Sequence, residues 1–137
     1  MIHLIDASVW LASDDDSNSS TEAAEALLTH PDAMPAALDL TLLEVINVRS
    51  RRKAGTARLP VGREISAITS GRVMSLSETE LTALEDLCEQ HPLSAYDGAY
   101  VIASLTRNMK LVSLDMKDLV EPGWAVTPQQ ALEAIAA

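Results

Sequence analysis

The sequence predicts an α/β domain with a parallel sheet, because short apolar runs alternate with longer segments of helical spacing. Strands of a parallel sheet are buried on both faces and therefore appear as continuous apolar runs. The 137 residues fit one domain, residues 1–137, and 47% of them are hydrophobic, which suffices for a core. No apolar run approaches the roughly 18 residues of a membrane span, and no signal peptide is recognisable. A single cysteine fits a reducing cytoplasm.

In the first half of the chain, two apolar runs alternate with three helical segments. Residues 2–5 form a short strand that Asp6 ends, and residues 34–36 form a second strand. The predicted helices cover residues 19–28, 39–55 and 60–71. The first of them begins with a capping-box pattern over residues 19–22, and Pro60 suits the first turn of the third.

The second half continues the alternation. Its predicted strands are 73–76, 111–114 and 124–126. Ser77 and Glu80 form a capping-box pattern for a helix that Pro92 ends, and Ser94 caps the next helix. A terminal helix begins at residues 127–128. Five strands are therefore expected in all.

The basic residues are concentrated in one segment of an acidic chain. With 20 acidic and 10 basic residues the net charge is −10, which does not favour non-specific binding to nucleic acid. Seven of the ten basic residues nevertheless lie between residues 49 and 72, where Glu64 is the one acid. Cations suit a helix C-terminus, but their number here favours contact with phosphates. The expected backbone contacts of a bound nucleic acid are Arg49, Arg51, Arg52 and Lys53.

Two aspartates stand where predicted strands end. Asp6 follows the first strand, and Asp115 follows the run at residues 111–114. Ligands of open α/β sheets bind at the carboxyl ends of the strands, beside the point where the strand order reverses. Each aspartate could alternatively cap whatever structure follows it.

Glu44 and Asp97 are two further acids in unusual settings. Glu44 is the one charged residue from residue 40 to residue 48, and no cation lies three or four residues away on its helix face. A buried, unpaired carboxylate is costly, so Glu44 must be exposed, protonated or compensated by a metal ion. Asp97 either completes a capping box with Ser94 or directs its carboxylate toward the end of the sheet.

Together these four acids indicate a site for a hard divalent cation, since Mg²⁺ and Mn²⁺ prefer oxygen ligands. Ser8 and Ser113 could support such a site by holding waters or phosphate oxygens. Other chemistries find less support. The histidines show no zinc-type spacing, and no glycine-rich phosphate loop or nucleophile elbow is present.

The sequence resembles the PIN-domain family, and within it the VapC-like toxins of toxin–antitoxin pairs. The segments that carry the resemblance are residues 5–8 (IDAS), 42–48 (LLEVINV), 96–100 (YDGAY) and 111–119 (LVSLDMKDL). Each motif alone is weak, whereas all four in this order across nearly the whole chain are specific. One departure is Gly98, where many members carry a bulkier residue.

The resemblance implies a three-layer α/β/α domain with a five-stranded parallel sheet and an Mg²⁺- or Mn²⁺-dependent endoribonuclease activity. It also implies a homodimer and inhibition by a partner antitoxin. The carried-over catalytic and metal-binding acids are Asp6, Glu44, Asp97 and Asp115. Ser8 and Ser113 match supporting positions, and Asp118 matches a further acid of some members.

The expected reaction is metal-assisted hydrolysis of an RNA phosphodiester, leaving 5′-phosphate and 3′-hydroxyl ends as in the family. Glu44 or Asp97 would orient or deprotonate the attacking water. One alternative is an inactive PIN module that binds RNA or a protein without cutting, although all four acids are present. The other is a receiver-like signalling domain, which would need paired acids early in the chain and a lysine near its end; Asp6 stands alone on its strand.

Overall fold

A four-stranded parallel sheet lies at the centre of the protein. The computed structural model describes residues 1–52 and 59–137. The strands are β1 (His3–Ile5), β2 (Pro35–Leu38), β3 (Val73–Met74) and β4 (Lys110–Val112). Their order is β3-β2-β1-β4, with His3 opposite Pro35 on one side and Lys110 on the other. The chain thus builds outward from β1 and then returns to its other side, so the strand order reverses between β1 and β4.

The prediction of five strands is wrong at residues 124–126. This segment lies beside β4 but makes one isolated parallel bridge, from Val126 to Val112. Val126 N–H donates to Leu111 O at 3.0 Å, and Ser113 N–H donates to Val126 O at 2.9 Å. Thr127 is already the N-cap of the terminal helix, so the chain turns away before a second pair can form.

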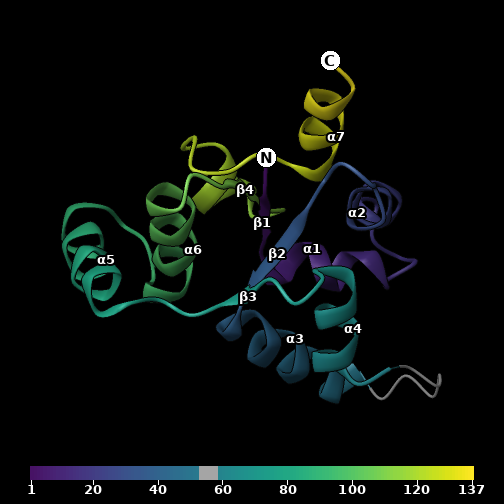
Figure 1. The fold of residues 1–137 in the computed structure, drawn as a ribbon, viewed down its shortest axis with the longest axis horizontal. Helices are drawn as coiled ribbons and strands as arrows, with labels where there is room; N and C mark the ends of the chain where they lie inside the picture. Colours follow the sequence, from purple (N-terminus) through teal and green to yellow (C-terminus); the bar gives the residue numbers. More distant parts are fainter. Residues whose placement is uncertain (53–58) are drawn as a thin grey trace.

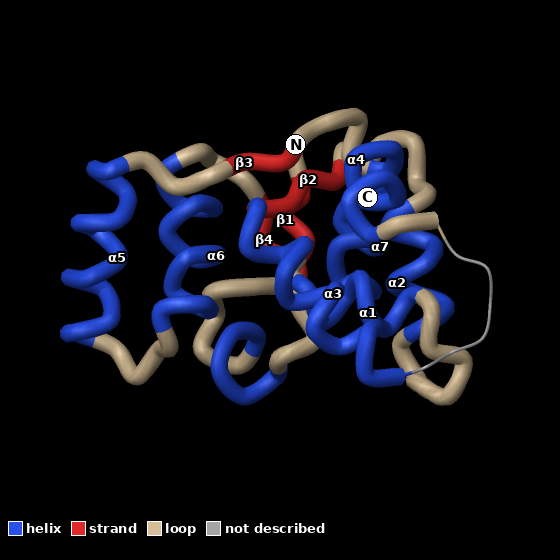
Figure 2. Tube along the Cα trace, turned by 90° about the horizontal axis from the view of Figure 1, so that it is seen from below, coloured by secondary structure: helices blue, strands red, loops and turns tan. Residues whose placement is uncertain are grey.

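Helices cover both faces of the sheet, which confirms the predicted α/β class. Helices α5 (Glu78–Gln90) and α6 (Ala95–Thr106) lie on one side (Figure 1). The other side carries α1 (Ala7–Ser13), α2 (Thr21–Leu28), α4 (Val61–Ile68) and α7 (Pro128–Ala136), with α3 (Asp39–Arg52) beside α1 and α4. Figure 2 shows the strands between these two groups of helices. None of the helices in the two described ranges has the length and apolar character needed to cross a membrane.

Successive residues of each strand enter different cores. Leu4 and Leu111 pack in the core beneath α6, whereas Ile5 and Val112 pack in the core that contains Trp10 of α1. This alternation follows from the two-residue period of a strand. Because both faces are buried, the strands are mostly apolar, with His3 and Lys110 at the first positions of β1 and β4.

Side-chain caps explain where several helices begin. The predicted capping box of Ser77 and Glu80 forms at α5, and Ser94 caps α6. The box predicted over residues 19–22 does not form. Helix α2 begins at Thr21 after Ser20, whose φ of −98° and ψ of 3° depart from the extended backbone of most N-caps. The predicted helix end near residue 55 lies outside the described residues.

Two further elements follow the strand-ending aspartates. The seven-residue helix α1 follows Asp6, and the π-helical turn η1 (Met116–Val120) follows Asp115. Both aspartates are therefore N-caps, as the alternative interpretation of the sequence proposed. Helix α1 and turn η1 therefore begin at the carboxyl ends of β1 and β4, where Asp6 and Asp115 lie.

Candidate metal centre

Asp6 is buried at the carboxyl end of β1, with 5% of its surface exposed. Its Oδ1 accepts hydrogen bonds from the Ser8 hydroxyl at 2.5 Å and from Val9 N–H at 3.4 Å. Its Oδ2 accepts a hydrogen bond from the Ser113 hydroxyl at 2.5 Å. Both carboxylate oxygens are thus held by neutral donors, and no arginine or lysine of the described residues bonds to either.

The two serines connect the loop after β1 to the loop after β4. Leu114 N–H donates to the Ser8 hydroxyl oxygen at 2.9 Å, and Asp115 N–H donates to the Ser113 hydroxyl oxygen at 3.0 Å. Each serine therefore donates to Asp6 and accepts from the backbone near Asp115. These bonds fix the two predicted acids relative to each other through residues that the sequence placed in a supporting role.

Burial raises the pKa of Asp6 to about 6, because removal from water disfavours the ionised form. The hydrogen bonds from Ser113, Ser8 and Val9 oppose this shift, and the negative charge of Glu44 adds to it. The structure thus holds a carboxylate whose charge its own donors compensate only in part.

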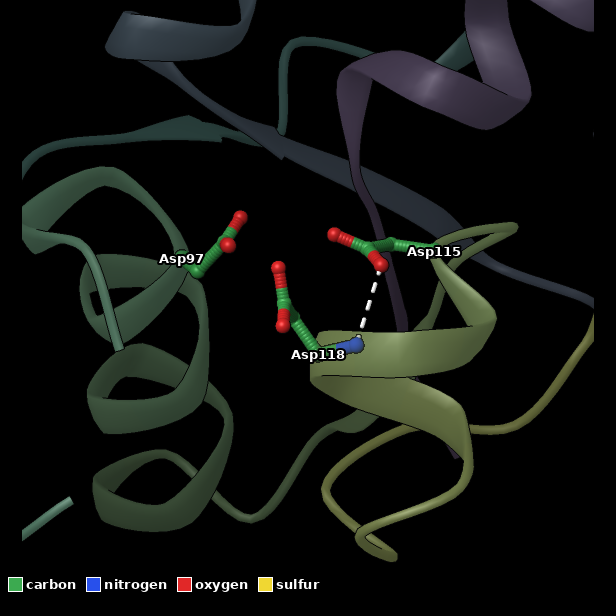
Figure 3. Close-up of side chains that lie close together, drawn as sticks. All are labelled: Asp97, Asp115 and Asp118. Atoms are coloured by element: carbon green, nitrogen blue, oxygen red, sulfur yellow. Dashed lines mark hydrogen bonds between the residues drawn. The ribbon is translucent and has the colours of Figure 1, made fainter. Parts of the chain in front are cut away.

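Three more carboxylates converge beside this loop. Asp97, Asp115 and Asp118 each offer one oxygen atom, and the three atoms lie within 4.8 Å of one another. Figure 3 shows the three side chains approaching from α6 and from the start of η1, with Asp118 N–H donating to Asp115 Oδ1 at 3.0 Å. The turn of η1 therefore places Asp118, which the family resemblance had suggested as a further acid, next to Asp97.

Asp97 occupies the third position of α6, but its carboxylate does not complete a capping box. Its N–H donates to the Ser94 hydroxyl at 3.1 Å, and the reciprocal bond is not formed. The pKa of Asp97 is raised, first by burial and then by the charges of Asp115 and Asp118; a hydrogen bond with Ser94 opposes the shift.

Glu44 faces the same site from α3. Its pKa is raised by burial and, to a smaller extent, by Asp97, while a hydrogen bond from Tyr100 lowers it. The Tyr100 hydroxyl donates to Glu44 Oε1 at 2.7 Å. Sequence reasoning assigned no role to Tyr100, although its position three residues after Asp97 puts both on one face of α6.

The basic segment is divided between structural and exposed residues. Arg49 is a structural residue, with 10% of its side chain exposed and its guanidinium bonded to Asp14 Oδ2 at 2.6 Å and Glu64 Oε2 at 2.7 Å. The structure therefore does not present Arg49 for phosphate contact. Arg51 and Arg52 are exposed, and Lys53 lies outside the described residues.

A groove of about 760 Å³ opens next to the acids. Glu44 forms part of its wall, and apolar side chains of α3, α5 and α6 form most of the rest. Leu43, Leu81 and Tyr96 line the groove and are exposed. Exposed apolar side chains gathered beside a polar site are typical of binding surfaces.

Comparison with solved structures identifies the architecture. The chain superimposes on VapC20 of Mycobacterium tuberculosis, described as a sarcin-ricin loop cleaving toxin, with a TM-score of 0.70 and 16% identity over 88% of this chain and 95% of that one. A toxin–antitoxin complex from Klebsiella pneumoniae matches with a TM-score of 0.68 and 17% identity over 92% and 97%. The chain has a PIN-like fold.

A third solved structure, PAE2754 from Pyrobaculum aerophilum, matches the PIN-like chain with a TM-score of 0.67 and 22% identity, covering 99% of this chain and 90% of that one. No protein-family model and no curated protein matches the sequence. At these identities the likeness shows the fold alone, and the chemistry of the site depends on its own residues.

The donor set of this site fits a hard divalent cation. Three carboxylate oxygens lie close enough to share one ion, and burial and mutual repulsion raise the pKa of Asp97. A cation among these groups would relieve that repulsion, and carboxylate oxygens are the ligands that Mg²⁺ and Mn²⁺ prefer.

Gly98, the departure from the family pattern, has a packing explanation. A Cβ atom at this position would lie 2.6 Å from Leu84 Cδ1 and 3.2 Å from Cys88 Sγ of α5. Glycine therefore allows α5 to approach α6 closely just behind Asp97. The departure concerns the back of the helix and leaves the acid on its site-facing position unaffected.

Proposed function

We propose that the protein is a divalent-metal-dependent endoribonuclease, the toxin of a toxin–antitoxin pair, that hydrolyses RNA phosphodiester bonds in the cytoplasm. The observation that carries this proposal is the gathering of incompletely compensated carboxylates at the switch point of a PIN-like sheet. The likeness of the protein to toxins of this fold, one of them described as cleaving the sarcin-ricin loop, supports RNA as the substrate.

The residues of the site have different proposed roles. Asp97, Asp115 and Asp118 would hold Mg²⁺ or Mn²⁺. Asp6 and Glu44 are proposed as further ligands, as the family resemblance implies. Such an ion lowers the pKa of bound water and neutralises the scissile phosphate. Ser8 and Ser113 keep Asp6 in place through hydrogen bonds at both oxygens. Glu44 or Asp97, whose pKa values are both raised, would accept the proton of the attacking water.

The RNA backbone needs cationic contacts, since the acids repel phosphate wherever no metal ion screens them. Arg51 and Arg52 are exposed at the end of α3, the helix that carries Glu44. Arg52 lies 3.9 Å from Asp15, at the limit of an ion pair, with 39% of its side chain exposed. We assign the backbone contact to these two arginines and Lys53.

The partner proposed for the groove is an antitoxin segment with apolar side chains and a cationic residue. The apolar ones would occupy the space beside Leu43 and Leu81, and an arginine would enter among the acids in place of the metal ion. One matched structure is itself described as a toxin–antitoxin complex. A homodimer, as the sequence resemblance implies, is part of the same proposal.

Cleavage of RNA by the purified protein tests the proposal. With Mg²⁺ or Mn²⁺ we expect internal cleavage that leaves 5′-phosphate ends, and with a chelator we expect no cleavage and an intact fold by circular dichroism. Asp6→Asn controls for contaminating nucleases and should be inactive. Glu22→Gln is a matched control, because Glu22 is an exposed acid on α2. Undiminished cleavage in chelator, or by Asp6→Asn, would contradict the proposal.

A further inference from the structure

A chain of buried hydroxyl groups ends on Glu44. Leu38 N–H, at the end of β2, donates to Thr41 Oγ1 at 3.2 Å. The Thr41 and Tyr100 hydroxyl oxygens lie 2.8 Å apart, and the Tyr100 hydroxyl lies 2.7 Å from Glu44 Oε1. This series of hydrogen bonds thus connects the sheet, α3 and α6.

The chemistry of the groups sets the direction of every bond in this chain. An ionised carboxylate can only accept, so Tyr100 gives its single hydroxyl proton to Glu44. The Thr41 hydroxyl must then donate to the Tyr100 oxygen, while its own oxygen accepts from Leu38 N–H. Each group has one compatible arrangement, and the last acceptor is Glu44 Oε1.

The residues that carry these hydroxyl groups are buried. Thr41 has none of its surface exposed, and Tyr100 has 2% exposed. A buried hydroxyl that loses its partner is costly, and a hydrogen bond to a charged group contributes about 1.5–3 kcal/mol. The two buried hydroxyl groups therefore support the Glu44 side chain, in contrast to an exposed hydroxyl, which water could replace.

Glu44 is neither an N-cap nor a residue that directly follows a strand, in contrast to Asp6 and Asp115. Glu44 lies within α3, and its long side chain has several rotatable bonds. Tyr100 occupies Oε1, and no described residue makes a hydrogen bond to Oε2. The support thus restrains the side chain at one oxygen and leaves the other for a ligand.

We propose that Tyr100, supported by Thr41, is a positioning residue that holds Glu44 by one carboxylate oxygen so that the other can serve the divalent ion or its water. The proposal rests on the proposed function, since it assigns Glu44 a role in the metal centre. It adds two residues, Thr41 and Tyr100, to the machinery of the site. Tyr100 acts through Glu44 and does not contact the RNA.

Calorimetric titration of Mn²⁺ into wild type and variants, with no RNA present, tests this role. Tyr100→Phe keeps the ring and removes only the hydroxyl. Thr41→Val is the second variant, because it removes the support one step earlier. Ser104→Ala is the matched control: Ser104 is a buried hydroxyl on α6 that bonds to Val101 O at 2.8 Å, away from Glu44.

We expect Tyr100→Phe to bind Mn²⁺ about tenfold more weakly than wild type, the lower end of the 10–100-fold range for outer ligand supports. Ser104→Ala should bind as wild type does. Glu44→Gln and Glu44→Gln/Tyr100→Phe should bind equally weakly, because Tyr100 acts only through Glu44. Thermal unfolding of each variant reports any purely structural effect.

Either of two results would overturn the positioning role. The first is that Tyr100→Phe binds Mn²⁺ as tightly as wild type does. The second is that Tyr100→Phe weakens binding by the same factor in the wild-type and Glu44→Gln backgrounds. A wild-type protein that binds no Mn²⁺ is a different failure. It would overturn the proposed function itself, and the positioning role would fall with it.

Discussion

Asp6 and Glu80 are both buried carboxylates, yet their surroundings are opposite in character. Asp6 is 5% exposed and Glu80 is 7% exposed. Arg107 binds Glu80 through two nitrogens, with Nη2 at 2.7 Å from Oε1 and Nε at 3.1 Å from Oε2. Asp6 receives hydrogen bonds from two serine hydroxyls and one backbone N–H. One carboxylate has a cation within the protein, and the other has neutral donors.

The pKa values follow this difference. The Arg107 guanidinium, with help from Ser77 and Thr106, holds the pKa of Glu80 well below its usual range. Burial raises the pKa of Asp6 to about 6, and the hydrogen bonds from Ser113, Ser8 and Val9 oppose this shift only in part. Both residues are shielded from solvent, but the charge of Glu80 is paired with Arg107, whereas the charge of Asp6 is left for a ligand to neutralise.

The largest expected effect separates the two regions by activity. Asp97→Asn should reduce RNA cleavage by more than about a hundredfold, since even outer-shell supports of a metal site cost about 10–100-fold. Glu80→Gln should retain wild-type specific activity, because Glu80 serves the packing of α5 against α6. Initial rates on a labelled RNA at saturating Mn²⁺ measure both. Equal losses in the two variants would remove the distinction.

The second prediction concerns pH in the metal-free protein. Between pH 4 and pH 6 the folded state binds more protons at Asp6 than the unfolded state does, so stability falls as pH rises through this window. A shift of about two pKa units corresponds to about 3 kcal/mol. Glu80 has the opposite sign, because its stabilisation is lost as pH falls below its ordinary value.

Urea unfolding at a series of pH values, with wild type compared with Asp6→Asn, measures the Asp6 contribution. The difference in free energy of unfolding between the two should change across pH 4–6 and become constant above it. Glu44 and Asp97 add a slope of the same sign in both proteins, because their pKa values are also raised. A constant difference throughout would show that Asp6 ionises normally.

A smaller effect is expected in melting temperature at pH 7.5 without metal. Glu80→Gln should lower it by about 7 °C, since the loss of a charged hydrogen-bonding partner costs about 2 kcal/mol. Asp6→Asn should raise it by about 3 °C, because it removes a buried charge that is only partly compensated, while the amide oxygen still accepts a hydrogen bond. Differential scanning calorimetry gives both values. A decrease in both variants would mean that Asp6, too, is a structural acid.

Much of the fold could be predicted because it depends on local patterns. Apolar runs located the strands, and Ser77 with Glu80 marked the start of α5. Helix α1 was missed because Val9, Trp10 and Ala12 are all buried, so its seven residues show no polar face. The predicted fifth strand does not form, because Thr127 caps α7 directly after Val126 and leaves room for only one bridge to β4.

The site divides in the same way. Asp6 and Asp115 could be recognised because the carboxyl ends of neighbouring parallel strands meet at one edge of the sheet. The contact of Tyr100 with Glu44 joins residues 56 apart in the sequence, which no local pattern encodes. The pairing of Arg49 with Asp14 and Glu64 likewise depends on how α1, α3 and α4 pack. Its position among other basic residues suggested a phosphate contact, whereas the structure shows its guanidinium in ion pairs within the protein.

The carboxylates at the switch point are proposed to bind a divalent ion, and anomalous scattering from Mn²⁺ detects such an ion directly. Crystals soaked in Mn²⁺ should give an anomalous difference peak within coordination distance of Asp97, Asp115 and Asp118. Glu80, already paired with Arg107, should show none. The absence of a peak at the aspartates, in crystals of a protein that cleaves RNA with Mn²⁺, would show that these carboxylates do not hold the ion.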